Sequence, residues 1–554
     1  MDRHGRRLTV VGLTLAALVP LAFFGAFFAW PVTSIVSRGF VVDGRLDLTA
    51  FAEVLGAERT WRLIGLTVAQ ATAGTAIAVV LGVPGAYVLY RLRFPGRTAV
   101  RALVTVPFVL PTVVVGVAFR SLLVDGGPLG SLGADGTFGA VVAALVFFNY
   151  AVVVRTVGSM WAHLDPRPEL AARTLGASPL RAFRKVTLPA LTPAIASAAA
   201  LVFLFCATAF GTVLVLGGAD YGTVETEIWV QTTQFLDLRA AAVLSVVQLV
   251  VVAGSLGAAG WSRRRRETAL RLQPDTTVER AVRRGDAPLV AVTALVAVGL
   301  LVMPMASLVA GSLRTPEGWG LANYSNLATT GPGSILEVTV WQAMLNSLRI
   351  AVDATWIALL VGVLACLVLS RRPRHPAGRR AVGVFDGLFM LPLGVSAVTV
   401  GFGFLITLNR PPVDLRSSVI LVPIAQAVVA IPLVIRTLLP VLRAIDQRLR
   451  DAAAVLGAGP GRVFATVDLP VLGRSLGLAV GFSFAVSLGE FGATSFLSRP
   501  DRPTLPVVIY RLIGQPGPDN LGMALAASVV LALLTTAVIS VAERLRVQSV
   551  GADL

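Results

Sequence analysis

Ionisable side chains, among them Arg349, Asp353 and Glu490, stand inside long apolar stretches of this 554-residue sequence. At the centre of a bilayer a charged side chain costs at least about 2.5 to 3.5 kcal/mol, so such residues are candidates for function if the stretches cross a membrane. Arg349 and Asp353 are four residues apart, so on a helix they share a face and can neutralise each other. Asp353 is therefore either half of an internal pair or part of a path through the protein. Glu490 lies toward one end of its stretch, where it is either a gating group or a carboxylate paired within its helix.

The common nucleotide, metal and disulfide motifs are not found in the sequence. A phosphate-binding loop needs glycine-rich backbone and a lysine before serine or threonine, but the only lysine, Lys185, precedes a valine. Cys206 and Cys366 fall inside apolar runs, as small core residues do. The three histidines have no metal-ligand spacing. We expect no metal site and no ATP hydrolysis on this chain.

The composition indicates a membrane protein. Hydrophobic residues make up 55% of the chain and charged residues 14%, and the mean hydropathy is +0.79. A helix needs about 20 mostly apolar residues to cross a bilayer. The first such run in the sequence, 8–36, is longer than the apolar core of a signal peptide, so we interpret it as a retained span. The other runs lie near 62–90, 102–123, 138–161, 189–216, 240–261, 288–310, 343–370, 383–407, 418–440, 470–496 and 519–541. The sequence thus predicts an all-α integral membrane protein with about 12 transmembrane helices.

The basic residues of this chain, whose net charge is +17, follow alternate loops. By the positive-inside rule their side is cytoplasmic, so both termini are predicted inside. The opposite loop 217–238 carries Asp220, Glu225, Glu227 and Asp237 and no basic residue. The basic groups are Arg3, Arg6 and Arg7; Arg91, Arg93, Arg97 and Arg101; 167–185; 263–284; 371–380; 443–474; and Arg544 with Arg546.

The sequence is a tandem repeat, because many matched residues lie 281 positions apart. The pairs are Pro95 and Pro376, Pro111 and Pro392, Arg155 and Arg436, Asp165 and Asp446, Gly176 and Gly457, Pro189 and Pro470, and Phe210 and Phe491. An even number of spans separates the copies, which makes the repeat parallel. We assign 1–261 and 288–554 to two six-helix domains and 262–287 to a basic cytoplasmic linker. The linker is a tether and orientation signal, or alternatively a binding site for lipid or a regulator.

Each half carries a similar loop between two predicted spans. The first duplicated loop, 165–189, reads PELAARTLGASP before Leu188-Pro189, and the second, 446–470, reads RDAAAVLGAGP before Leu469-Pro470. Alanine favours helix, glycine after leucine ends it, and proline starts the next turn. Each loop is therefore predicted to form helix, sharp bend and helix, a compact unit able to transmit a push from a docked protein.

These loops resemble the EAA loop of permeases in binding-protein-dependent ABC importers. In that family an acidic residue, two alanines and a glycine lead to Leu-Pro, and the short helix docks into a cleft of the ATPase subunit. Asp451 occupies the acidic position in the second loop, whereas Leu170 occupies it in the first and Glu169 lies one residue earlier. The residues that the resemblance assigns to ATPase coupling are Asp165, Glu169, Ala171, Ala172, Gly176, Pro179, Pro189, Asp446, Asp451, Ala452, Ala453, Gly457, Pro460 and Pro470.

The resemblance covers nearly the whole chain and is nearest to fused two-copy permeases of the thiamine and ferric-iron group. Stretches that carry it include RFPGR at 93–97, FGTVL at 210–214 and TLP at 504–506, while LGEFGA at 488–493 is also similar to molybdate and sulfate permeases. The resemblance implies a multi-pass inner-membrane permease for a small solute, thiamine or ferric iron, delivered by an external binding protein. It also implies two copies of a cytoplasmic ABC ATPase, with ATP and Mg on those partners and no cofactor on this chain.

Four residues are candidates for the solute path or its gate: Asp353, Glu490, Trp229 and Tyr510. The repeat counterpart of Glu490 is the apolar Ala209, and Glu490 could alternatively contact the binding protein. Trp229 and Tyr510 are repeat-matched aromatics, suited to an interfacial belt or to cation recognition.

Two other functional classes are an ion-coupled secondary transporter and a membrane scaffold. An ion-coupled secondary transporter also uses parallel repeats but needs an intramembrane ion relay, which the sparse Asp353 and Glu490 provide poorly. A membrane scaffold without transport would not need a duplicated docking loop.

Overall fold

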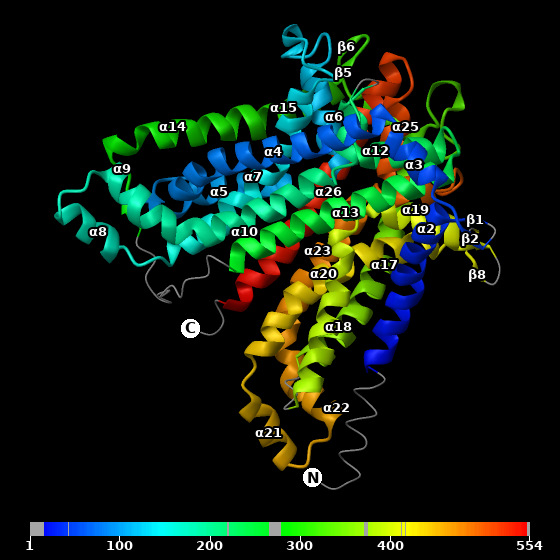
Figure 1. Cartoon of the computed structure of the whole chain (residues 1–554). Helices are drawn as coiled ribbons and strands as arrows, with labels where there is room; N and C mark the ends of the chain where they lie inside the picture. The colour runs from blue at the N-terminus through cyan, green and yellow to red at the C-terminus, as the bar shows by residue number, and fades with distance from the viewer. Residues whose placement is uncertain are drawn as a thin grey trace. The chain divides into compact units, whose positions relative to one another are not determined.

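The computed structural model describes residues 16–42, 44–218, 221–264, 279–370, 375–410, 413–415 and 417–550 (Figure 1). The N-terminal basic group, most of the predicted linker and Asp220 lie outside these residues. Within them the regular structure is helical apart from two-residue strands. The chain forms two compact units: unit 1 is Met1–Ala50, Gln231–Val243 and Thr315–Leu554, and unit 2 is Phe51–Val230 and Leu244–Arg314.

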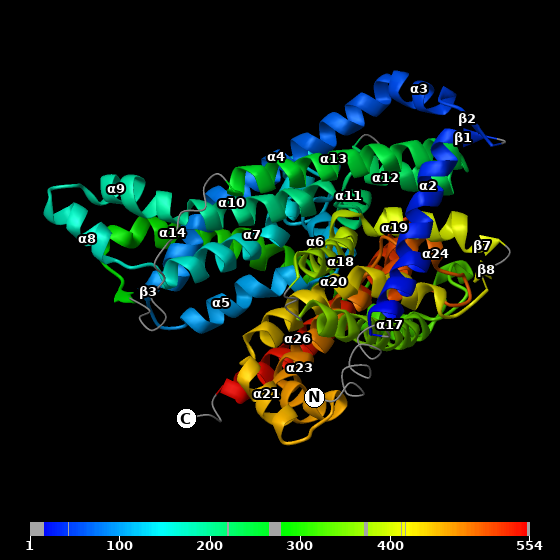
Figure 2. The same cartoon turned by 60° about the horizontal axis from the view of Figure 1, so that its bottom comes forward.

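Unit 2 is built on three long helices, α4, α7 and α10, which pack against one another (Figures 1 and 2). Its elements are α4 (Glu58–Arg91), β3 (Leu92–Arg93), α5 (Arg97–Thr105), α6 (Thr112–Leu123), α7 (Phe138–Ala162), α8 (Arg167–Thr174), α9 (Pro179–Ala182), α10 (Leu188–Ala207), α11 (Gly211–Leu216), β4 (Arg280–Ala281), α14 (Ala287–Leu295) and α15 (Met303–Ser312). The elements α3 (Thr49–Gly56), α12 (Val224–Thr233), α13 (Leu238–Arg264) and β5 (Arg314–Thr315) have residues in both units.

Unit 1 is built on the matching helices α17, α20 and α23, which also pack against one another. Its elements are the helix Ala16–Phe40, which contains α2 (Trp30–Phe40), then β1 (Val41–Val42), β2 (Arg45–Leu46), β6 (Gly318–Trp319), α16 (Ala322–Ser325), α17 (Val340–Leu369), α18 (Pro376–Gly394), α19 (Ala397–Thr407), β7 (Asn409–Arg410), β8 (Val413–Asp414), α20 (Leu421–Ala444), α21 (Gln447–Val455), α22 (Pro460–Val463), α23 (Leu469–Gly489), α24 (Thr494–Leu497), α25 (Leu505–Ile513) and α26 (Pro518–Val550).

The duplication is visible in the positions of the elements. Helices α9 and α22, the π-helical turns Phe183–Thr187 and Phe464–Asp468, and the first residues of α10 and α23 are each 281 residues apart. The compact units do not coincide with the halves of the sequence: the helix Ala16–Phe40 belongs to unit 1, and α14 and α15 belong to unit 2. The repeat boundaries at 261 and 288 describe sequence similarity and stay a prediction.

The described residues hold eight helices long and apolar enough to cross a membrane, or up to eleven if three bent pairs each count as one span. The predicted all-α membrane fold with about 12 transmembrane helices is therefore confirmed in class, and the described residues supply eight to eleven of the spans. Pro111 stands at the break between Arg97–Val109 and Thr112–Leu123, which are bent by 107°, because proline cannot continue the hydrogen bonding of the first helix. The run predicted near 240–261 lies within α13, Leu238–Arg264.

Small side chains let the long helices approach closely, as in other membrane helix bundles. In α4 a Cβ added at Gly82 would lie 2.6 Å from Cγ1 of Val153 in α7, and in α17 a Cβ at Gly362 would lie 2.6 Å from Cγ1 of Val434 in α20. In both halves, therefore, a glycine of the first long helix packs against a valine of the second.

Replacing Gly82 with leucine should force α4 and α7 apart and destabilise the protein by about 1 to 3 kcal/mol, the usual range for overpacking. The measurement is the thermal unfolding of the detergent-solubilised protein. Gly65→Leu is the control, because a Cβ at this exposed position of the same helix meets nothing within 4 Å. Equal unfolding temperatures for the two variants would contradict the close-contact explanation.

Candidate functional site

The two duplicated loops have the predicted helix, bend and helix. In unit 2, α8 and α9 connect α7 to α10, and in unit 1, α21 and α22 connect α20 to α23. In each loop a π-helical turn, Phe183–Thr187 or Phe464–Asp468, leads directly into the long helix.

The bends require glycine. Gly176 has φ +87° and Gly457 has φ +83°, in the left-handed region that other residues avoid. The following N–H reaches back to a helix carbonyl, which caps the C-terminus of α8 and of α21. These bonds run from Ala177 to Ala172 and from Ala458 to Ala453, at 3.0 Å in both loops.

The predicted acidic residues have different roles. Asp165 and Asp446 each accept a hydrogen bond of 2.9 Å from the backbone N–H two residues later, at the start of α8 and α21. Glu169 accepts a hydrogen bond of 2.7 Å from Thr187 Oγ1. Asp451 is exposed and is bonded by Gln447 Nε2 at 3.1 Å. Glu169 is therefore not a displaced copy of Asp451.

The small residues and prolines shape the surface and the turns. Ala171 and Ala452 are exposed, whereas Ala172 and Ala453 are half-buried. Pro179 and Pro460 begin α9 and α22, and Pro189 and Pro470 are the second residues of α10 and α23, where proline is tolerated.

Both loops present large apolar side chains to solvent. Leu175 is 89% exposed and its repeat counterpart Leu456 is 87% exposed. Such patches mark interaction surfaces. The sequence analysis missed these leucines, although their place directly before the bend glycine could have identified them. The other exposed large apolar residues described in the loops are Leu170, Leu180, Leu449, Val455 and Leu469.

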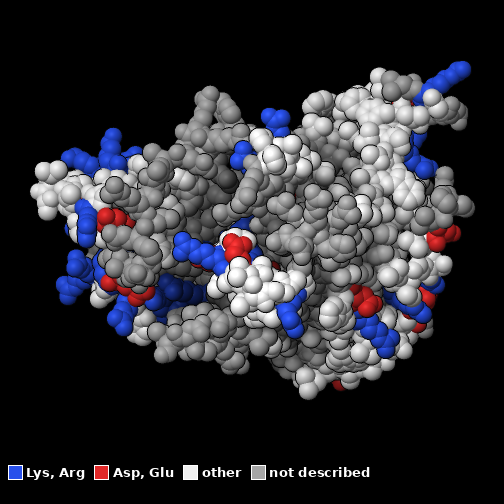
Figure 3. Space-filling model, turned by 90° about the horizontal axis from the view of Figure 1, so that it is seen from below, with Lys and Arg blue, Asp and Glu red and all other residues white. Residues whose placement is uncertain are grey.

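The first duplicated loop also carries exposed cations. Figure 3 shows Lys and Arg atoms crowded at the left end of the molecule, where α8 and α9 lie in Figure 1. The exposed cations of this loop are Arg167, Arg173, Arg181, Arg184 and Lys185.

The end of the predicted linker is attached to unit 2. β4 pairs with β3 in parallel, and Glu279 forms an ion pair of 2.8 Å with Arg97. The hydrogen bond from Arg97 holds the pKa of Glu279 below its ordinary value. Arg280 forms an ion pair of 2.6 Å with Asp286 and donates to the Tyr87 hydroxyl, and the bond to Asp286 raises the pKa of Arg280. This part of the linker is a structural element rather than a free tether.

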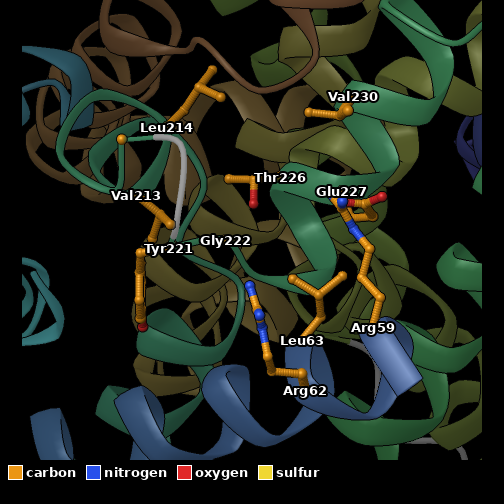
Figure 4. A pocket seen from close by; sticks show the side chains of 11 residues that line it. Arg59, Arg62, Leu63, Val213, Leu214, Tyr221, Gly222, Thr226, Glu227 and Val230 are labelled. Carbon is orange, nitrogen blue, oxygen red and sulfur yellow. The ribbon is translucent and has the colours of Figure 1, made fainter. Parts of the chain in front are cut away.

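Unit 2 contains a cavity of about 130 Å³ beside α12 (Figure 4). Arg59 and Arg62 of α4 line it together with Glu227, whose buried carboxylate lies 2.9 Å from Arg59 Nη2. A cavity lined by two guanidinium groups and one carboxylate is not suited to binding a cation. The other lining residues are Leu63, Val213, Leu214, Gly218, Tyr221, Gly222, Thr226 and Val230.

The described acidic residues of the loop 217–238 form contacts within the protein. Glu225 and Glu227 are buried, and Asp237 accepts from the N–H groups of Arg239 and Ala240 at the start of α13. Trp229 and Tyr510 occupy matching positions in α12 and α25 and are half-buried. The Tyr510 ring packs on Phe491, with centroids 5.4 Å apart.

Glu490 is a capping carboxylate in the structure. It is 7% exposed and lies between α23 and α24. Its Oε1 accepts from the Ala493 N–H at 2.7 Å, and its Oε2 accepts from the Thr494 N–H at 3.0 Å and from the Thr494 hydroxyl. Arg349 and Asp353 share the exposed face of α17, but among the described residues no ion pair joins them.

Two glutamines that the sequence analysis did not single out cap the end of α10. Gln70 Nε2 donates to Cys206 O at 2.8 Å, and Gln248 Nε2 donates to Ala207 O at 3.0 Å. Tyr221 donates in turn to Gln70 Oε1 at 2.7 Å. These buried side chains satisfy carbonyl groups that a helix end leaves without partners.

Comparisons with known proteins identify the family. Residues 74–310 match the family described as binding-protein-dependent transport system inner membrane component. The chain is 31% identical over 250 residues to the sulfate transport system permease protein CysT of Salmonella typhimurium, which covers 44% of this chain and 89% of that protein. The chain belongs to this family of ABC importer permeases. The thiamine transport system permease protein ThiP of Escherichia coli is 28% identical to this permease over 510 residues, or 89% of this chain and 90% of that protein. The ThiP of Salmonella typhimurium is 28% identical over 471 residues, 82% and 84% of the two chains.

Among solved structures, a bacterial ABC transporter involved in the import of the acidic polysaccharide alginate aligns with 48% of this permease and 99% of that chain, with 17% identity and a TM-score of 0.42.

The family membership confirms the predicted resemblance and the predicted all-α fold. The permease is a multi-pass protein of the inner membrane and a transport component rather than an enzyme. Among its described residues, no group of three or more His, Cys, Asp or Glu could hold a metal ion.

Proposed function

We propose that this permease imports thiamine that an external binding protein delivers. The observation that carries this proposal is the extent of the similarity to ThiP, which spans 89% of this chain and 90% of the Escherichia coli protein, and so includes both halves of the repeat. The CysT similarity spans 44% of the chain.

We further propose that two copies of a cytoplasmic ABC ATPase drive the import, one on each duplicated loop. ATP and Mg bind to those subunits, and this chain carries no cofactor. The support is the matched geometry: two short helices with the same glycine bend, each presenting an almost fully exposed leucine at the same repeat position. The distribution of arginine over alternate loops supports a cytoplasmic position for both duplicated loops and both termini in this proposal.

In this mechanism closure of the ATPase dimer moves the two short helices, and the π-helical turns pass that movement to α10 and α23. The long helices then open the path to the outside, and ATP hydrolysis resets them. The path residues Asp353, Trp229 and Tyr510 remain candidates in this proposal, whereas the hydrogen bonds of Glu490 favour a structural role.

The test is solute uptake by proteoliposomes that contain the permease, a candidate ABC ATPase and a thiamine-binding protein. ATP-dependent uptake of thiamine, with no uptake without ATP, is the expected result. Sulfate and ferric iron serve as competing solutes. Sulfate is included because the similarity to CysT makes an oxyanion the second candidate, and ferric iron because the resemblance also includes ferric-iron permeases. Uptake of sulfate but not thiamine would overturn the solute proposal, and uptake independent of ATP would indicate a secondary transporter.

A further inference from the structure

The two duplicated loops are each tied to the following long helix by one side-chain bond at the same repeat position. In unit 2, Thr187 Oγ1 donates to Glu169 Oε2 at 2.7 Å. In unit 1, Arg450 Nε donates to Asp468 Oδ1 at 2.8 Å. Glu169 and Arg450 are 281 residues apart, and so are Thr187 and Asp468.

The two ties have opposite chemistry. The short helix supplies the hydrogen-bond acceptor in the first loop and the donor in the second. The first pair contains one charged group and the second is an ion pair. Because the contact persists although neither residue type does, we infer that the geometry itself is required.

Each tie bypasses the glycine bend. Thr187 and Asp468 are the last residues of the π-helical turns, directly before α10 and α23, and are 2% and 3% exposed. Without the tie, the exposed bend and the next short helix would be the main connection between α8 and α10 or between α21 and α23. When the tie is present, a displacement of the short helix also moves the residue directly before the long helix.

A third group completes the match. Arg450 Nη2 also donates to Leu442 O at 3.2 Å, near the end of α20. The repeat counterpart of Leu442 is Trp161, whose carbonyl accepts from Arg91 Nη1 of α4 at 3.4 Å. In each half an arginine donates to this carbonyl and a carboxylate takes part in the tie. The arginine is Arg91 in the first half and Arg450 in the second, and these are not repeat counterparts.

We propose that Glu169–Thr187 and Arg450–Asp468 are latches: positioning residues that make each short helix and its long helix move as one body, so that ATP-driven movement is converted into transport. This inference rests on the proposed docking of ATPase subunits on the duplicated loops. Breaking the second latch should have the larger effect, because its side chains are 9% and 4% exposed and removal of either partner leaves a buried charge unpaired.

The test is to transplant the second latch into the first loop. Glu169→Arg and Thr187→Asp are made singly and together, and the readout in proteoliposomes is the number of ATP molecules hydrolysed per solute transported. Each single variant should raise this ratio at least about fivefold. Glu169→Arg removes the acceptor of the Thr187 hydroxyl, and Thr187→Asp places a second carboxylate beside that of Glu169. The double variant, which recreates the Arg–Asp pair beside Arg91, should return to within about twofold of the parent.

Milder variants separate a latch from a general loss of folding. Thr187→Val removes only the donor and should raise the ratio about twofold to threefold, whereas Asp468→Asn, which leaves Arg450 without its carboxylate, should raise it further. Thr192→Val is the matched control, because the Thr192 hydroxyl bonds only to Leu188 O of its own helix, at 2.9 Å, and its ratio should not change.

The outcomes distinguish this inference from the function on which it rests. If the parent permease does not co-purify with an ATPase, the docking proposal fails. If it does, and all variants co-purify equally, a double variant no better than the single variants would overturn the latch, as would single variants with the parental ratio.

Discussion

Replacing Gly457 with proline is expected to reduce ATP-driven uptake at least about tenfold. Gly457 has φ +83°, and its N–H donates to Ala454 O at 3.1 Å. Proline fixes φ near −65° and has no N–H, so the bend that positions α21 against α22 cannot form. We expect the second duplicated loop to lose its docking geometry while the long helices remain folded. The measurements are uptake in proteoliposomes and co-purification with the ATPase.

The matched control for this variant is Gly459→Ala in the same loop. Gly459 has no positive φ, and a Cβ there meets no atom within 4 Å, so this substitution should leave both measurements unchanged. Normal uptake by the Gly457→Pro variant would show that the bend in the second loop is not needed for coupling.

Replacing Glu490 with alanine should destabilise the permease by about 1.5 to 5 kcal/mol. The estimate combines the loss of a helix cap, about 0.5 to 2 kcal/mol, with the cost of leaving buried N–H groups without acceptors, about 1 to 3 kcal/mol. The affected donors are the N–H groups of Ala493 and Thr494 and the Thr494 hydroxyl. The measurement is the unfolding temperature in detergent, together with the KM for the solute.

The KM separates a structural cap from a gate. A cap predicts a lower unfolding temperature and an unchanged KM in the fraction that remains folded. Glu317→Ala is the control, since Glu317 is exposed in the turn between β5 and β6 and its loss should cost less than about 0.5 kcal/mol. Normal stability with an altered KM would instead place Glu490 on the solute path.

Much of the architecture could be predicted from local sequence features. Apolar run length identified the positions of the long helices, and the matched glycines predicted the bends, because a positive φ at Gly176 and Gly457 is a local backbone requirement. The bent spans were harder to predict, because an apolar run does not reveal whether its helix turns back within it. Pro111 was recognised only as a matched residue, although it stands at a 107° break.

The partners of polar side chains could not be predicted, because they depend on tertiary packing. Glu169 looked like a shifted copy of the acidic residue Asp451, but its partner is Thr187, and its true counterpart is the arginine at 450. Gln70 gave no local signal, since the carbonyl that it caps belongs to Cys206, on a different helix. Such contacts need the packing of α4 against α10 before they can be seen.

Cross-linking from the two exposed leucines of the duplicated loops tests whether these loops dock the ATPase subunits. Leu175→Cys and Leu456→Cys each place a thiol at a position that is almost fully exposed, whereas the native Cys206 and Cys366 are buried and should not react. In membranes that contain the assembled importer, a bifunctional maleimide is expected to link each variant to an ABC ATPase subunit. Absence of both cross-links in a preparation that still imports solute would contradict the account.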